Sequence, residues 1–244
     1  MVPVTSYVGI DLAAEAVRTG LAVVRGQGES CIVEHVQVGA DDEALVAEVR
    51  PGGRTGIDVP VGWPMRFVDF VSAHARGTLL RPVSTGSEWR RSLAMRATDL
   101  EVHRRTGITP LSVATDRIAR AAMRWAGIEA RLRDEGVEVA RDGSGVICEV
   151  YPAAALKCWS LRHNGYKGLK NAAQLSVLVS AVSERFPWLD WNGNEGLCSR
   201  DDNAFDVVVA ALIAREAELG RCEPPPQHLQ EAARREGWIW LPRH

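Results

Sequence analysis

The sequence has few of the features that mark secreted, zinc-binding or membrane proteins. Its five cysteines are an odd number and include no C-x-x-C pair, so we expect reduced packing residues rather than disulfides or a zinc site. No apolar run approaches a membrane span, and the first residues lack a basic stretch before an apolar segment. These absences predict a cytoplasmic protein with no membrane partner.

Lysine is scarce, and neither sign of charge is in large excess. The 244 residues have a net charge of −2, which excludes a uniformly basic nucleic-acid-binding protein but leaves room for a local basic face. Only three lysines accompany 26 arginines. The 46% hydrophobic and 25% charged residues are typical of a folded chain with a substantial core.

Segments rich in β-branched residues predict the strands of the first part of the chain. Three follow one another at 7–13, 19–25 and 31–38, and the short GQGES turn suits a hairpin. A helix at 40–50 and a fourth strand at 55–61 come next. We therefore expect an antiparallel meander, followed by a crossover to a strand that is parallel to the first or the third.

Helical patterns dominate the rest of the chain. The segment 64–135 has no convincing strand, a strand returns at 145–153, and the strongest helix runs over 203–220. A short terminal strand or tail follows it. The prediction is a single α/β domain over residues 1–244, with a helical insertion at about 64–140.

Three predicted strands carry an acid between apolar neighbours, where packing alone does not favour one. These acids are Asp11, Asp58 and Glu149. An ionised carboxylate in such a strand needs a partner or a metal, because its desolvation is otherwise unfavourable by several kcal/mol, roughly. If the strands are parallel neighbours, the acids gather at the edge where open α/β sheets bind ligands.

The late helix adds two more acids. Asp202 and Asp206 are four residues apart and share one face, and Asp206 interrupts the apolar run AFDVVVAALIA. Clustered carboxylates favour hard cations, so the candidate ligands Asp11, Asp58, Asp202 and Asp206 predict one or two Mg²⁺ or Mn²⁺ ions.

An ordered set of motifs resembles a known family. The segments GIDLA, GIDVPVGWP, MRATD, CEVYPAAAL and DDNAFDVVVAALIA are similar to those of a bacterial and archaeal family of unknown function, described as predicted nucleases with a ribonuclease H-like fold. The resemblance implies a mixed five-stranded sheet flanked by helices, with three antiparallel strands, then parallel strands, and a helical insertion between strands four and five. It also implies a metal-dependent phosphodiester hydrolase.

The resemblance assigns roles by position. It implies that Asp11, Asp58 and Asp206 are metal-binding catalytic acids, with Asp202 as a second candidate on the helix. Glu149 matches the acid of an E-V-Y-P motif, whereas Arg96 and Asp99 match R-x-T-D. The first-helix glutamate of ribonuclease H proper has two possible counterparts, Glu43 and Glu48, and the sequence does not choose between them.

Structural alternatives exist for several of these acids. Asp58 precedes a turn that it could cap, and Glu149 could pair with an arginine of the inserted helices. Asp201 and Asp202 precede a helix, where acids are favoured as caps; we expect the cap at Asp201 and leave Asp202 open. Asp206 lies too deep in the helix to cap it.

The inserted block carries a local excess of positive charge. The segment from Arg76 to Arg133 contains twelve arginines and five acids. This excess of positive charge favours contact with nucleic acid over a merely solvated surface. Arg90, Arg91 and Arg96 are the first choices for phosphate contact. Trp63, directly after the GIDVPVG turn, could stack on a base, although tryptophan is more often a core residue.

The function predicted from these patterns is a divalent-metal-dependent nuclease that hydrolyses phosphodiester bonds with an activated water. Two alternatives stay open. One is a nucleotide- or phosphate-binding protein related to actin-like sugar kinases, although a second copy of the fold unit is missing. The other is a catalytically inactive nucleic-acid-binding protein on the same scaffold.

Overall fold

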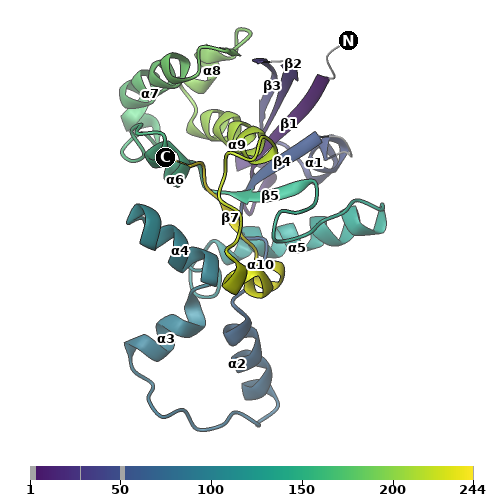
Figure 1. Cartoon of the computed structure of the whole chain (residues 1–244), viewed down its shortest axis with the longest axis vertical. Coiled ribbons are helices and arrows are strands. Elements are labelled where there is room, and N and C mark those ends of the chain that lie inside the picture. Colours follow the sequence, from purple (N-terminus) through teal and green to yellow (C-terminus); the bar gives the residue numbers. More distant parts are fainter. Residues whose placement is uncertain (1–3, 28, 50–52, 244) are drawn as a thin grey trace.

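The computed structural model describes residues 4–27, 29–49 and 53–243, and within these ranges the chain forms a mixed seven-stranded sheet with helices on both faces (Figure 1). The strand order is β6-β3-β2-β1-β4-β5-β7. The strands are β1 (Val4–Asp11), β2 (Gly20–Gln27), β3 (Ser30–Val38), β4 (Gly53–Asp58), β5 (Ile147–Val150), β6 (Leu189–Asp190) and β7 (Ile239–Trp240).

The predicted arrangement of the first four strands is confirmed. β1, β2 and β3 pair antiparallel, and β4 is parallel to β1. The described sheet has seven strands rather than the expected five, because β6 and β7 add one parallel strand at each edge. Each of these is two residues long, which is too short for an alternating pattern to predict it.

The helices of the described ranges differ from the prediction mainly in their boundaries. They are α1 (Asp42–Glu48), α2 (Met65–Ala75), α3 (Ser87–Ala94), α4 (Ala97–Thr106), α5 (Ala119–Asp134), α6 (Pro152–Cys158), α7 (Ala172–Arg185), α8 (Glu195–Cys198), α9 (Asp202–Glu218) and α10 (Gln230–Glu236). Within the block 64–135, which the sequence predicts to be helical, residues 89–105 are divided between α3 and α4. The helix α10 was not predicted.

The two faces of the sheet bury different cores. Val8 and Ile10 of β1 pack with residues of α1 and α5, whereas Tyr7 packs on the opposite face with α9. This alternation along β1 is the one the sequence predicts. The five cysteines are buried, as expected of packing residues.

Two glycines allow α9 to lie against the sheet. A Cβ atom on Gly9 would be 1.8 Å from the carbonyl oxygen of Val207, and one on Gly56 would be 2.4 Å from that of Ala210. Gly9 and Gly56 are register partners in the neighbouring parallel strands β1 and β4. The absence of side chains at these positions brings the first turns of α9 close to the ends of both strands.

The inserted helices α2 and α3 form an arm that projects away from the sheet (Figure 1). No residue between 65 and 95 is buried. The two helices contact each other through Phe70 and Trp89, whose rings meet edge to face with centroids 5.7 Å apart. The arm therefore has a small internal contact and no core of its own.

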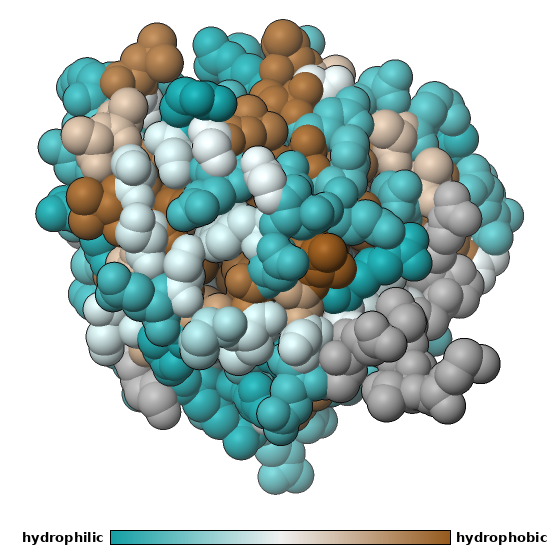
Figure 2. Space-filling model, turned by 90° about the horizontal axis from the view of Figure 1, so that it is seen from above, coloured by the Kyte–Doolittle hydropathy of each residue, from teal (hydrophilic) through white to brown (hydrophobic). Residues whose placement is uncertain are grey.

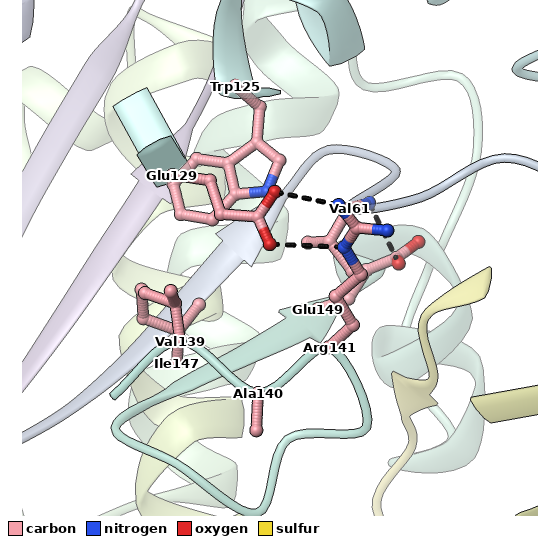
Figure 3. Close-up of a pocket in the computed structure, with 8 residues that line it drawn as sticks. All are labelled: Val61, Trp125, Glu129, Val139, Ala140, Arg141, Ile147 and Glu149. Carbon is pink, nitrogen blue, oxygen red and sulfur yellow. Dashed lines mark hydrogen bonds and ion pairs between the residues drawn. The ribbon is translucent and has the colours of Figure 1, made fainter. Parts of the chain in front are cut away.

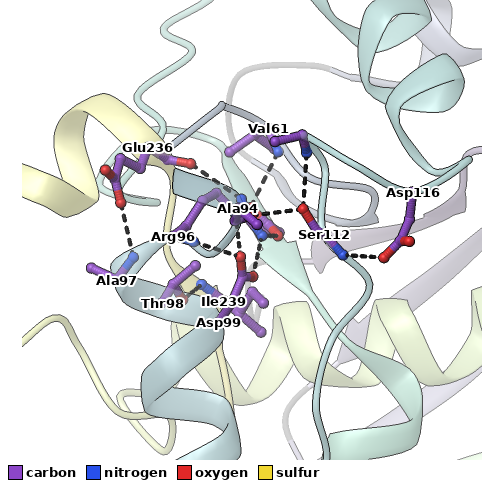
Figure 4. Close-up of polar contacts among 12 residues, drawn as sticks. Val61, Ala94, Arg96, Ala97, Thr98, Asp99, Ser112, Asp116, Glu236 and Ile239 are labelled. Carbon is purple, nitrogen blue, oxygen red and sulfur yellow. Dashed lines mark hydrogen bonds and ion pairs between the residues drawn. The ribbon is translucent and has the colours of Figure 1, made fainter. Parts of the chain in front are cut away.

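One carboxylate of α10 holds both ends of this arm. Oε1 of Glu236 accepts a hydrogen bond of 2.8 Å from the backbone N–H of Met65. Oε2 accepts one from the backbone N–H of Ala97, also at 2.8 Å (Figure 4). The start of α2 and the start of α4 are thus joined through a single side chain.

The surface at the end of the molecule opposite the arm is mixed in character. Hydrophilic residues and small hydrophobic groups alternate over it, as Figure 2 shows. No helix of the described residues has both the length and the apolar character needed to cross a membrane.

Candidate functional site

The first two acids of the candidate site are neighbours at the end of two parallel strands. Asp11 is the last residue of β1, Asp58 is the last residue of β4, and the two are register partners. Adjacent strands lie about 4.8 Å apart, so paired side chains of the same face are in contact range. Both residues are half-buried.

Asp206 joins them from α9. Because α9 approaches β1 and β4 over the two glycines, Asp206 lies beside the ends of these strands, with no exposed surface. Its Oδ1 accepts a hydrogen bond of 2.9 Å from the hydroxyl of Tyr166. Three acids that are distant in sequence therefore meet at one edge of the sheet.

A lysine that was not predicted completes the group. Nζ of Lys167 lies 2.5 Å from Oδ2 of Asp206, and this buried oxygen accepts no other hydrogen bond within the described residues. The backbone N–H of Gly168 donates to Oδ1 of Asp202 at 3.1 Å. The loop that carries Tyr166 and Lys167 is thus fixed to the beginning of α9 at three points.

The carboxylates remain under-compensated despite the lysine. Burial first, and then the charge of Asp206, raise the pKa of Asp11 to about 7, although Lys167 acts in the opposite direction. Burial and then Asp11 raise the pKa of Asp58 well above its ordinary value. Burial also raises the pKa of Asp206 against the effects of Lys167 and Tyr166. The site therefore favours additional positive charge.

Lys167 itself stays protonated in this setting. Burial alone lowers the pKa of its ammonium group, but the three carboxylates outweigh burial and raise that pKa above the ordinary value of 10.5. Its side chain is 54% exposed, although its ammonium contacts the fully buried Asp206.

An open pocket of about 290 Å³ lies over these groups. Its walls come from the ends of β1 and β4, from the segment between α4 and α5, and from the start of α6. The lining residues include Asp11, Asp58, Pro110, Leu111, Tyr151 and Lys167. The acids are therefore accessible to a ligand of moderate size.

Arg96 lies in a buried network rather than on a phosphate-binding surface. Its guanidinium donates to Oε1 and Oε2 of Glu149 at 2.6 and 2.8 Å, and to Oδ1 of Asp99 at 2.9 Å (Figure 4). Arg96 is 1% exposed. The expected phosphate contact therefore needs correction, because every nitrogen of this guanidinium already donates to a buried carboxylate of Asp99 or Glu149.

The same network supplies the structural partner expected for Glu149. Both of its oxygens are occupied by Arg96, and Oε2 also accepts from the backbone N–H of Val61 at 3.2 Å. Although Glu149 borders the pocket, its partner is an arginine at the start of the inserted α4, as the structural alternative expected. Asp99 likewise serves this network.

A second buried ion pair lies behind Glu149. Glu129 of α5 pairs with Arg141 through both of its oxygens, each at 3.0 Å (Figure 3). A void of about 10 Å³ separates this pair from Glu149, and the buried Nε1 of Trp125 has no partner among the described residues. A void of this volume has room for a single water.

The remaining predicted residues are dispersed. Arg90 and Arg91 are exposed on α3 in the arm, whereas Trp63 is half-buried and packs against the core formed with α1 and α5. Asp201 caps α9 by accepting from the backbone N–H groups of Asn203 and Ala204, as predicted.

Of the two glutamates expected to compete on the first helix, Glu43 pairs with Arg131 of α5. This pair lies on the far face of the sheet from α9, so Glu43 does not join the acids.

The carboxylate oxygens of the site are suitable ligands for a hard cation, but the side chains are not already positioned around a metal site. Within the described residues, no group of three or more histidine, cysteine or acidic side chains is already spaced to hold a metal ion. The group does contain three carboxylates against one ammonium, and Oδ2 of Asp206 has only that ammonium as a partner. Oxygen ligands of this kind suit Mg²⁺ or Mn²⁺.

Comparison with known proteins places the chain in a family. A family described as "Protein of unknown function (DUF429)" matches residues 9–231. The chain belongs to this family. The DUF429 match extends from β1 to α10 and therefore includes all three converging acids and the loop of Lys167. No curated protein and no solved structure matches the chain.

Replacing Asp11 with asparagine is expected to change how stability depends on pH. The folded-state pKa of Asp11, about 7, lies above its ordinary value of 3.8, so its contribution to stability is full below the ordinary value and is lost as the pH rises through 7. In metal-free buffer, Asp11→Asn should therefore be more stable than the wild type at pH 8, by an amount on the order of 2–4 kcal/mol, and much closer to it at about pH 5.

Urea unfolding at the two pH values, with a chelator present, measures this difference. A gap between variant and wild type that is the same at both pH values would contradict the assignment of uncompensated charge to Asp11.

Proposed function

We propose that this DUF429 protein is a divalent-metal-dependent nuclease with a ribonuclease H-like arrangement of its central strands. The observation that carries the proposal is the meeting of Asp11, Asp58 and Asp206, from three separate elements, beneath an open pocket. Parallel strands of α/β sheets present ligand sites at this edge.

The residues that would hold the ion are Asp11, Asp58 and Asp206, with Asp202 at the margin of the site. A bound Mg²⁺ or Mn²⁺ supplies a Lewis acid that makes water a stronger nucleophile and stabilises charge on the phosphate and on the leaving oxygen. Lys167 lines the pocket with Asp11 and Asp58, so it places a positive charge where an anionic phosphate would enter.

The arm provides a surface for the nucleic acid. Its exposed arginines outnumber its acids, Asp69 and Glu88, and none of its residues is committed to a core. These arginines are Arg66, Arg76, Arg81, Arg90 and Arg91. Contacts between arginine and phosphate give affinity without sequence preference, so the arm suits a polymeric substrate.

A nuclease assay with matched variants tests the proposal. Single-stranded, double-stranded, hybrid and branched oligonucleotides are incubated with Mg²⁺ or Mn²⁺, and Asp11→Asn is compared with Asp134→Asn, an exposed acid at the end of α5. We expect cleavage by the wild type and by Asp134→Asn, and a loss of at least about 100-fold for Asp11→Asn, since even second-layer residues around metals contribute about 10–100-fold.

Calorimetric titration of the metal separates the alternatives. Equal metal affinity in the wild type and in Asp11→Asn would remove the metal site from the proposal. Metal-independent binding of oligonucleotides, with no cleavage of any substrate, would instead favour the inactive nucleic-acid-binding protein.

A further inference from the structure

We propose that Lys167 is a resident cation of the acidic site, and that one divalent ion, not two, completes it. This inference rests on the proposed function. It begins with the contact between Nζ of Lys167 and Oδ2 of Asp206, at 2.5 Å, and with the place of Lys167 in the lining of the pocket that also contains Asp11 and Asp58. An ammonium in that position occupies space and charge that a second metal ion would need.

The residues on either side of Lys167 fix the position of its ammonium. Tyr166, beside it in sequence, is 1% exposed, donates to Oδ1 of Asp206, and packs edge to face on Phe205 with centroids 5.8 Å apart. On the other side, the N–H of Gly168 binds Asp202. Lys167 is therefore held between two anchored residues, unlike a surface lysine that pairs with whichever acid is near.

Charge balance indicates how many ions the site accepts. Three carboxylates and one ammonium leave two negative charges, which equals the charge of one divalent ion. Two divalent ions together with Lys167 would leave an excess of two positive charges on the protein groups. A buried site is stable when its charges are paired, so the single ion is favoured.

The position of Lys167 also allows its ammonium to contact a ligand in the pocket. Lys167 lines the pocket with Asp11 and Asp58, so an anionic ligand that reaches the acids also meets this positive charge. Asp11, Asp58 and Asp206 would hold the one metal ion, and Lys167 would supply the second positive charge that a second metal ion supplies in two-metal sites.

The test counts bound ions on the full-length, metal-free chain. Mn²⁺ is titrated into the wild type, Lys167→Met and Lys167→Arg by calorimetry, and electron paramagnetic resonance reports whether two ions lie within coupling range, roughly 3.5–4 Å. We expect one ion for the wild type and for Lys167→Arg, and two coupled ions for Lys167→Met, with the first bound at least about 10-fold more tightly because a competing cation is gone.

Three outcomes overturn the inference. Two coupled ions in the wild type, or a single ion of unchanged affinity in Lys167→Met, contradict it while leaving the proposed nuclease intact. No Mn²⁺ bound by any of the three proteins removes the metal site itself and the proposed function with it. If Lys167→Met does not fold, the wild type and Lys167→Arg still decide the question, since both must bind one ion.

Discussion

The substitution Gly9→Ala is expected to destabilise the protein by at least about 3 kcal/mol, at the upper end of the usual effect of overpacking. The added Cβ would lie 1.8 Å from the carbonyl oxygen of Val207 and 2.6 Å from the backbone nitrogen of Ala211. Both are helix backbone atoms, so no side chain can move aside. Either α9 shifts away from β1, or the strand distorts, and Asp206 leaves its place beside Asp11 in both cases.

A second glycine provides the control. Gly127 is exposed within α5, and a Cβ there would meet nothing within 4 Å. Gly127→Ala should stabilise the protein by about 0.5–1 kcal/mol through the higher helix propensity of alanine. Both free energies come from urea unfolding, and a Gly9→Ala variant as stable as the wild type would show that α9 does not lie against β1 as described.

The substitution Arg96→Met is expected to destabilise the protein by about 3–5 kcal/mol, because it leaves buried carboxylates without their counter-charge. Glu149 and Asp99 are 3% and 0% exposed, and each accepts hydrogen bonds from this guanidinium. The deficit should shrink as the pH falls, because burial raises the pKa of Glu149 and protonation neutralises its stranded carboxylate.

Arg104→Met is the matched control for this change. Arg104 belongs to the neighbouring α4 and pairs with Glu101, but its side chain is 71% exposed. Solvent screens that pair, so the loss should be below about 1 kcal/mol. Thermal or urea unfolding compares the two variants, and similar small losses in both would mean that the Arg96 network is not needed for the fold.

The sequence carries enough information to predict why Asp11 and Asp58 meet. Each is the last residue of a Gly-Ile-Asp triplet, strand alternation puts both acids on one face, and a parallel crossover brings the two strands into register. Asp206 could be selected because it interrupts an apolar helix without any capping role. These inferences depend on local periodicity and connection geometry, which a single sequence contains.

Other features depend on long-range contacts that periodicity does not encode. Arg96 resembled a surface arginine in an arginine-rich block, and only packing against Glu149, fifty-three residues later, shows it to be buried. No periodic pattern in the sequence marks Lys167 as a partner of Asp206. The one available signal was that lysine is rare in this chain and that this one lies among glycines, with Gly165 and Gly168 both at positive φ.

The way in which Glu236 joins Met65 and Ala97 makes the arm modular. Both ends of the insertion converge on one carboxylate, so the polypeptide leaves the body of the protein and returns to it at nearly the same place. Changes in the length or composition of α2 and α3 need not propagate into the sheet. The ends of β1 and β4, with Asp11 and Asp58, would keep their geometry under such changes.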